Sequence, residues 1–302
     1  DYRVGFDGDG RIQGVEFDQA ARCGMSYDLS VPICDRAMFH ADNTYYLANA
    51  RITSYRCKTN TVSNTAFRGF GGPQGMIGIE RVIDEIAHFL GKDPLAVRRA
   101  NFYDPQGAVG ERSVTPYDMK VEDCIIDELV EELRKSADYD QRRDDIRAWN
   151  RSSGTLKRGI ALTPVKFGIS FTLTFLNQAG ALIHVYNDGS IHLNHGGTEM
   201  GQGLFTKVAQ VVAESFQVDI DTVKITATNT AMVPNTSATA ASSGSDLNGM
   251  AAYDATNKIK TRMTRVAAGH FGVAPEEIEF RQNRVYAGNE SLSFAEAAQM
   301  TW

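Results

Sequence analysis

The sequence is poor in cysteine, and its cysteines form no cluster. The 302 residues include only Cys23, Cys34, Cys57 and Cys124, which are far apart and contain no CxxC pair. Zinc and iron–sulfur centres need thiolates at close, regular spacing, so this chain alone builds neither of them. We therefore predict reduced thiols and a cytoplasmic location.

The chain also lacks long apolar runs and an excess of positive charge. No segment approaches the roughly 18 consecutive apolar residues of a membrane-spanning helix, and the first residues show no signal-peptide pattern. Lys and Arg total 31 against 37 Asp and Glu, which gives a net charge of −6. This balance provides no broad basic surface, so we predict neither a nucleic-acid nor a membrane partner.

Histidines are few and scattered. Neither H-x-x-x-H nor H-E-x-x-H occurs among the six histidines, and His192 and His195 are most simply residues on the faces of a strand. The residues therefore predict no metal ion held by protein side chains.

The remaining composition is typical of a globular protein, with 42% hydrophobic and 23% charged residues. At about 150 residues per domain, the length predicts two domains, 1–150 and 151–302, with the polar stretch at 149–155 as the linker candidate. Turn signals at residues 7–10 and 187–189 lie between alternating segments and predict a hairpin at the start of each half. Spacings of three and four predict helices, and the fold class is α+β in two halves.

Each hairpin is followed by a glycine-rich loop that runs into a helical pattern. The loops are residues 67–75 (FRGFGGPQG) and 196–203 (GGTEMGQG). Free backbone N–H groups at a helix start favour phosphate or another anionic ligand, although neither loop has a known nucleotide signature. Glycines that serve only tight turns and close packing are the alternative. The two similar arrangements suggest a loose structural duplication.

Three other features permit a structural or a functional interpretation. The small-residue segment 235–245 (NTSATAASSGS) precedes a helical pattern, and its hydroxyls either cap that helix or let a flat ligand approach the backbone. Arg68 either forks hydrogen bonds to an anionic or carbonyl group or braces its own loop. Phe171 is a core residue by composition alone.

Four motifs in order resemble the molybdenum-binding subunit of the xanthine oxidase and aldehyde oxidase family, in its xanthine dehydrogenase form. They are residues 64–75 (NTAFRGFGGPQG), 166–181 (KFGISFTLTFLNQAGA), 196–203 (GGTEMGQG) and 239–242 (TAAS). The resemblance extends over nearly the whole chain. It implies the molybdenum cofactor-binding domain fold of the xanthine oxidase type, with two α/β subdomains of mixed sheets and packed helices.

The resemblance implies that a molybdopterin cofactor holds the metal through its dithiolene, while the protein clamps the pterin. It places six residues at this cofactor: Arg68, Met200, Gly201, Gln202, Thr239 and Ser242. It places six others at the substrate: Arg36, Phe70, Phe171, Thr172, Ala240 and Ala241. Subdomain 1–150 would bind molybdopterin and substrate, and subdomain 151–302 would bind molybdopterin.

The resemblance also implies roles for these substrate residues. Phe70 and Phe171 would sandwich a planar heterocycle, with Ala240 and Ala241 as the floor of the pocket. Arg36 would polarise a purine carbonyl, and Thr172 would donate a hydrogen bond. Family members that oxidise aldehydes usually lack such an arginine, so Arg36 favours hypoxanthine and xanthine.

The implied reaction is hydroxylation of a ring carbon with water, followed by electron transfer to 2Fe-2S and FAD centres in other parts of the enzyme. The family's general base is a glutamate in a G-E-P-P-like motif, which this sequence lacks. The catalytic set is therefore incomplete, and we expect an internal fragment that is inactive alone. An aldehyde or other N-heterocycle hydroxylase, or a cofactor-free binding or assembly module, are the alternatives.

Overall fold

The computed structural model describes residues 1–107, 112–169, 171–229, 231 and 236–302. Ser170 and Asn235, which belong to two of the motifs above, lie outside the described residues. The chain divides into two compact units, Asp1–Gly168 and Ile169–Trp302. The predicted boundary after residue 150 falls inside the first unit, because Trp149 and its neighbours extend a helix instead of forming a linker.

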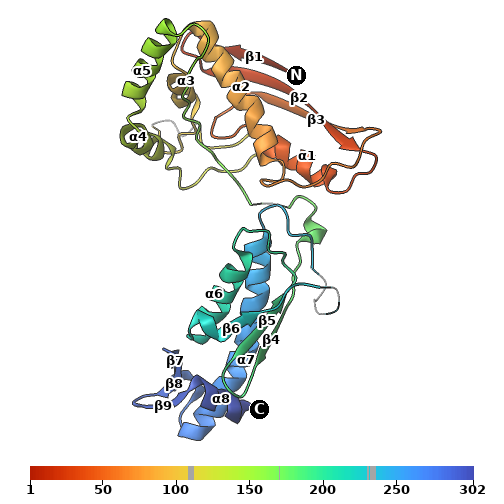
Figure 1. Cartoon of the computed structure of the whole chain (residues 1–302), viewed down its shortest axis with the longest axis vertical. Coiled ribbons are helices and arrows are strands. Elements are labelled where there is room, and N and C mark those ends of the chain that lie inside the picture. The colour runs from red at the N-terminus through yellow and green to blue at the C-terminus, as the bar shows by residue number, and fades with distance from the viewer. Residues whose placement is uncertain (108–111, 170, 230, 232–235) are drawn as a thin grey trace. The chain divides into compact units, whose positions relative to one another are not determined.

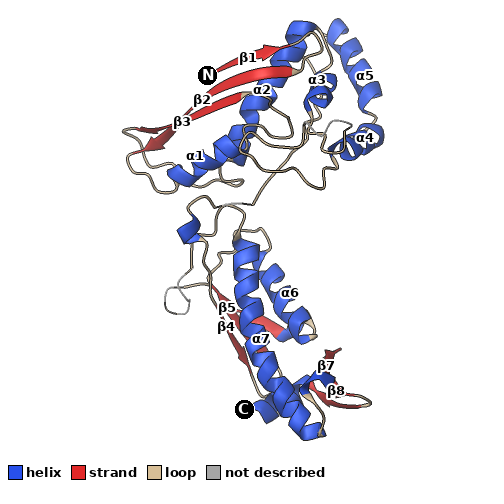
Figure 2. Ribbon diagram, turned by 180° about the vertical axis from the view of Figure 1, so that it is seen from behind, coloured by secondary structure: helices blue, strands red, loops and turns tan. Residues whose placement is uncertain are grey.

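Unit 1 is a three-stranded sheet with helices packed on it. Its strands are β1 (Tyr2–Phe6), β2 (Ile12–Gly24) and β3 (Ala50–Lys58), and its helices are α1 (Ser30–Phe39), α2 (Gly72–Leu90), α3 (Pro94–Asn101), α4 (Ile126–Ser136) and α5 (Tyr139–Ser152). Strand β2 pairs with β1 in antiparallel and with β3 in parallel orientation. Figures 1 and 2 show α1 and α2 along the same face of this sheet.

Helix α2 follows directly from its sequence. Met76, Ile79, Ile83 and Ile86 recur at helical spacing, and all four side chains are buried. Gly91 ends the helix in the left-handed conformation, and its N–H donates to the carbonyls at the last turn. The buried side chains of α2 form the centre of the core of unit 1.

Unit 2 repeats the same strand arrangement and adds a small antiparallel sheet. Its strands are β4 (Ala181–Val185), β5 (Ile191–His195), β6 (Val223–Ile225), β7 (Ile278–Arg281), β8 (Arg284–Ala287) and β9 (Glu290–Ser293). Its helices are α6 (Leu204–Phe216), α7 (Gly244–Phe271) and α8 (Phe294–Thr301), with 3-10 turns at Thr174–Leu176, Ile220–Thr222 and Pro275–Glu277. Strand β5 pairs with β4 in antiparallel and with β6 in parallel orientation, as β2 does with its neighbours.

The shared topology changes how the two halves correspond. A helix connects the two parallel strands in each unit, α1 in the first and α6 in the second, and a longer helix follows, α2 or α7. The 67–75 loop precedes α2, whereas the 196–203 loop precedes α6. The duplication therefore pairs the first glycine loop with the segment before α7, and the expected pairing of the two glycine loops with each other is wrong.

The parallel pairs also place loops together. Strands that run in the same direction end at the same edge of a sheet, so the loops that follow them emerge side by side. In unit 1, Met25 N–H donates to the Thr61 carbonyl at 3.0 Å. In unit 2, the Thr228 hydroxyl donates to the His195 carbonyl at 3.2 Å. Each unit thus has one edge at which two loops meet.

Candidate functional site

Three of the four motifs meet within unit 2, at the ends of β5 and β6. Thr198 N–H donates to Thr239 Oγ1 at 2.8 Å, which joins the 196–203 loop to the segment before α7. Ser237 N–H donates to the Gln178 carbonyl at 3.2 Å, which joins that segment to the motif beginning at 166. This meeting of loops at the carboxyl ends of parallel strands is where α/β folds commonly bind ligands.

Glycine is required where these loops touch. A Cβ atom at Gly196 would lie 2.1 Å from Thr236 Cγ2, and one at Gly197 would lie 2.6 Å from Leu204 Cδ2. Gly201 differs, because no atom of the described residues beyond its two chain neighbours lies within 4 Å of its Cβ position. The first two glycines serve close packing, while Gly201 has open space beside it in a left-handed turn.

The cofactor residues proposed in the 196–203 loop already bond to one another. Gln202 Oε1 accepts from Met200 N–H at 2.5 Å, and Gln202 Nε2 donates to the Thr198 carbonyl at 2.8 Å. The Met200 side chain is 65% exposed. The loop is thus held in shape from within, with Met200 and Gly201 at its outer side.

The segment before α7 has an unusual backbone. Ala241 and Ser242 have φ values of 56° and 64°, a conformation that non-glycine residues seldom adopt. Ser243 directs its hydroxyl to the Ala240 carbonyl, so the expected hydroxyl cap of the helix is not formed by this residue. Ala241 is buried and Ser242 is exposed. Two successive residues of this kind store strain, which is common at binding sites.

Phe171 and Thr172 lie in unit 2 with the loops just described. Phe171 is 5% exposed, and its carbonyl accepts from Asn177 Nδ2 at 3.3 Å. Thr172 Oγ1 is buried and has no hydrogen-bond partner among the described residues. His195 Nε2 is likewise buried and without a hydrogen-bond partner among the described residues. His195 Nδ1 accepts from Gly197 N–H at 3.1 Å. Burial lowers the pKa of His195, so its ring is neutral, and no described residue accepts a hydrogen bond from Nε2.

Arg36, Arg68 and Phe70 lie in unit 1. Phe70 is buried in the left-handed conformation, with φ 49°. Arg68 is exposed on the same loop, and its side chain makes none of the described hydrogen bonds, which does not support the loop-bracing interpretation. The loop glycines allow close packing, since a Cβ at Gly71 would lie 2.0 Å from the Ile33 carbonyl oxygen.

Arg36 braces the end of unit 1. It is fully buried, and its guanidinium donates to the Gly168 carbonyl and lies 4.9 Å from the centroid of the Phe167 ring. Burial lowers the pKa of this guanidinium. His40, one turn along α1, accepts from Gly168 N–H at 3.2 Å through Nε2. Arg36 thus has a structural role that sequence reasoning did not predict.

The segment 164–168, which contains Phe167 and Gly168, is anchored by a buried ion pair. Lys166 Nζ lies 2.5 Å from Asp42 Oδ2, and the Tyr103 hydroxyl donates to the same oxygen at 2.7 Å. Asp42 is 1% exposed, and burial raises its pKa although Lys166 counteracts the shift. Asn43 adds a hydrogen bond to the Pro164 carbonyl at 3.0 Å. The sequence signal for this ion pair is Lys166, because the rest of the 166–181 motif is uncharged.

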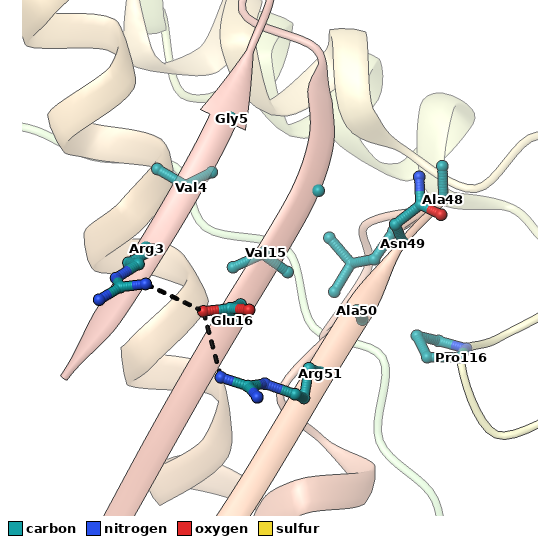
Figure 3. A pocket seen from close by; sticks show the side chains of 12 residues that line it. Arg3, Val4, Gly5, Val15, Glu16, Ala48, Asn49, Ala50, Arg51 and Pro116 are labelled. Atoms are coloured by element: carbon teal, nitrogen blue, oxygen red, sulfur yellow. Dashed lines mark ion pairs between the residues drawn. The ribbon is translucent and has the colours of Figure 1, made fainter.

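A groove of unit 1 lies elsewhere and is lined by none of the predicted site residues. It has a volume of about 780 Å³ and lies over the sheet, where Arg3, Glu16 and Arg51 form a row across the three strands (Figure 3). Glu16 pairs with Arg51 at 3.3 Å and with Arg3 at 3.9 Å. All three side chains are well exposed, so the row adds little stability.

No group of three or more potential ligands among His, Cys, Asp and Glu could hold a metal within the described ranges. In the same part of the chain, every helix is too short or too polar to cross a membrane.

Unit 2 is thus an α+β unit in which small-residue loops gather at the ends of parallel strands, the place where such folds commonly bind a ligand. Family models described as molybdopterin cofactor-binding domain match residues 1–102 and 132–302. The chain belongs to the molybdopterin cofactor-binding domain family. This confirms the predicted fold and the predicted cofactor class.

The chain is similar to curated xanthine dehydrogenases. It is 45% identical over 265 residues to the protein from Calliphora vicina, which covers 88% of this chain and 19% of that protein. It is 47% identical over 262 residues to the protein from Dictyostelium discoideum, which covers 87% of this chain and 19% of that protein. The chain thus spans about a fifth of the length of these relatives.

Solved structures show the same fold at lower identity. Quinoline 2-oxidoreductase from Pseudomonas putida 86 has 22% identity and a TM-score of 0.74, over 99% of this chain and 39% of that chain. Aldehyde oxidoreductase from Desulfovibrio desulfuricans has 21% identity and a TM-score of 0.66, over 87% of this chain and 28% of that chain. These similarities concern the fold alone.

Proposed function

We propose that this chain forms the molybdopterin-binding part of an enzyme similar to xanthine dehydrogenase, which hydroxylates hypoxanthine and xanthine with water. Iron–sulfur and FAD centres in other parts of the enzyme would accept the electrons. Identity of 45% and 47% to two xanthine dehydrogenases supports the proposal. The four free cysteines support a reducing, cytoplasmic location.

The meeting of three motifs in unit 2 carries the proposal. The bond from Thr198 N–H to Thr239 Oγ1 joins the two segments to which we assign cofactor contacts. The buried Thr172 Oγ1 and His195 Nε2 lack partners among the described residues, which fits a place where a polar ligand supplies hydrogen bonds. When bound, molybdopterin supplies the redox-active metal that the side chains do not provide.

We assign each predicted site residue a contact with the cofactor or with the substrate. Met200, Gly201, Gln202, Thr239 and Ser242 from unit 2, with Arg68 from unit 1, would hold the cofactor. Phe70 and Phe171 would orient the flat purine, Thr172 and Arg36 would hydrogen-bond it, and the small Ala240 and Ala241 would leave room for it. No complete catalytic set is proposed, because the family's general-base motif has no counterpart in this sequence. We expect the 302-residue chain to be inactive by itself.

Molybdenum and pterin content of the purified 302-residue chain tests this proposal. We expect about one molybdenum and one oxidised pterin per chain, and a large loss of both in Gln202→Ala. Gln141→Ala on the exposed face of α5 is the matched control and should retain full content. Full content in Gln202→Ala would contradict the proposal that this loop clamps the cofactor, whereas negligible content in all three proteins would place essential cofactor contacts outside these 302 residues.

A further inference from the structure

The Glu199 carboxylate occupies the start of helix α6. Its Oε1 accepts from Gly201 N–H at 2.8 Å and from Gly203 N–H at 3.0 Å. Its Oε2 accepts from Phe205 N–H at 2.9 Å. Three backbone donors thus converge on one side chain: Gly201 N–H from the loop, and Gly203 N–H and Phe205 N–H from the helix start, which have no intrahelical partners.

The backbone explains why this distant side chain is needed. The residue at the N-cap position is Gly203, which is left-handed with φ 76° and has no side chain to cap the helix. Serine, threonine, aspartate or asparagine usually supplies that acceptor from the N-cap itself. Glu199 reaches forward across the loop and takes their place.

The backbone hydrogen bonds keep this carboxylate ionised and make it a weaker base. The amide of Phe205, with those of Gly203, Gly201 and Leu204, holds the pKa of Glu199 below its usual value of 4.5. The group is therefore charged at neutral pH and compensates the positive end of the α6 dipole. A phosphate at the same place would lose its donors to Glu199 and would meet a negative charge.

We propose that Glu199 is a built-in anion that closes the α6 start to phosphate, so that the 196–203 loop takes a part of its ligand that carries no negative charge. This reverses the expectation that the second glycine loop offers free N–H groups to an anion. Met200 and Gly201 lie at the outer side of the loop, where such a group would contact it. The identity of the ligand rests on the proposed function, whereas the closure by Glu199 does not.

Inorganic phosphate is the probe for this proposal, with the full 302-residue chain labelled for NMR. In the unsubstituted protein, the amide signals of Gly201, Gly203 and Phe205 should not move as phosphate is added. In Glu199→Ala they should shift in a saturable way, because the donors become available. Their hydrogen exchange should also be about fivefold faster, as expected for the loss of a helix cap.

Two further variants separate the carboxylate from general effects. Glu199→Gln keeps the size of the side chain but removes its charge and one of its two acceptor oxygens, so its amides should respond to phosphate as those of Glu199→Ala do. Glu276→Ala removes an equally charged but exposed side chain in unit 2 and should behave like the unsubstituted protein. Saturable phosphate shifts at these three amides in the unsubstituted protein would overturn the proposal, and this measurement holds even if Glu199→Ala does not fold. This experiment does not measure cofactor content. A negative result here is therefore distinguishable from a failure of the proposed function.

Discussion

At the scale of single residues, Arg36 has a structural contact and a proposed substrate contact, and one substitution removes both. We assign it a substrate contact, yet in the structure its guanidinium donates to the Gly168 carbonyl and covers the Phe167 ring. Removing the side chain therefore loosens the 164–168 segment as well as the proposed purine contact. A variant that loosens this segment but keeps Arg36 is the necessary comparison.

Lys166→Met is that comparison, since it breaks the buried pair with Asp42. In the enzyme that contains this chain, we expect Arg36→Met to lower the ratio of xanthine turnover to aldehyde turnover about 100-fold, as for loss of one transition-state donor. Lys166→Met should lower both rates and leave the ratio unchanged. Equal ratios in the two variants would mean that Arg36 acts only through the 164–168 segment, and would favour the aldehyde or other heterocycle alternative.

Residue roles of this kind were only partly predictable. The sequence contains the motif residues, and their spacing indicates loops at helix starts. It does not reveal that Arg36 meets Gly168, because 132 positions separate them. It also does not reveal the capping role of Glu199, which depends on a loop geometry that no local pattern specifies.

At the scale of elements, the contact of α1 with the start of α2 depends on glycine. A Cβ at Gly75 would lie 2.1 Å from the Ala37 carbonyl oxygen, so the helices could not keep their present separation. We expect Gly75→Ala to lower the free energy of unfolding by about 1–3 kcal/mol, the usual cost of overpacking. Urea denaturation followed by circular dichroism measures this change.

Gly78→Ala in the same helix is the matched control. Its Cβ would meet only Phe17 Cε1 at 3.7 Å, an ordinary contact. Replacing this helical glycine by alanine should raise the free energy of unfolding by up to about 1 kcal/mol. If both substitutions were stabilising, the close packing of α1 on α2 would not be the reason for glycine at position 75.

Elements with strong local signals were predicted well. The turn signal at 7–10 lies between β1 and β2, and the helical patterns after 67–75 and 235–245 correspond to α2 and α7. Residues 149–155 were misread as a linker because α5 is very polar and buries only Tyr139. The sequence could not show how the two halves correspond, because the parallel pairing of β2 with β3 and of β5 with β6 joins strands that are distant in the chain.

At the scale of the whole molecule, the two units have separate cores. Ile83 and Leu193 are both fully buried, but one belongs to the core of unit 1 and the other to that of unit 2. We therefore expect two calorimetric unfolding transitions. Each substitution to alanine, at a cost of about 2–5 kcal/mol, should lower the midpoint of only one of them.

Differential scanning calorimetry of Ile83→Ala and Leu193→Ala makes this comparison directly. The two variants serve as controls for each other, because each removes a large aliphatic side chain from a fully buried position. A single transition that shifts to the same extent in both variants would show that the cores unfold as one cooperative system.

The parallel strand pairs also give each sheet one end that carries the meeting loops and an opposite end that does not. The turn between β1 and β2 lies at the opposite end in unit 1, and Gly8 within it is exposed with open space around it. A short peptide tag or a fluorescent label inserted there would leave the loop edge of unit 1 untouched. The architecture thus offers an attachment point for immobilising or tracking the protein while the edge at which the loops meet remains unmodified.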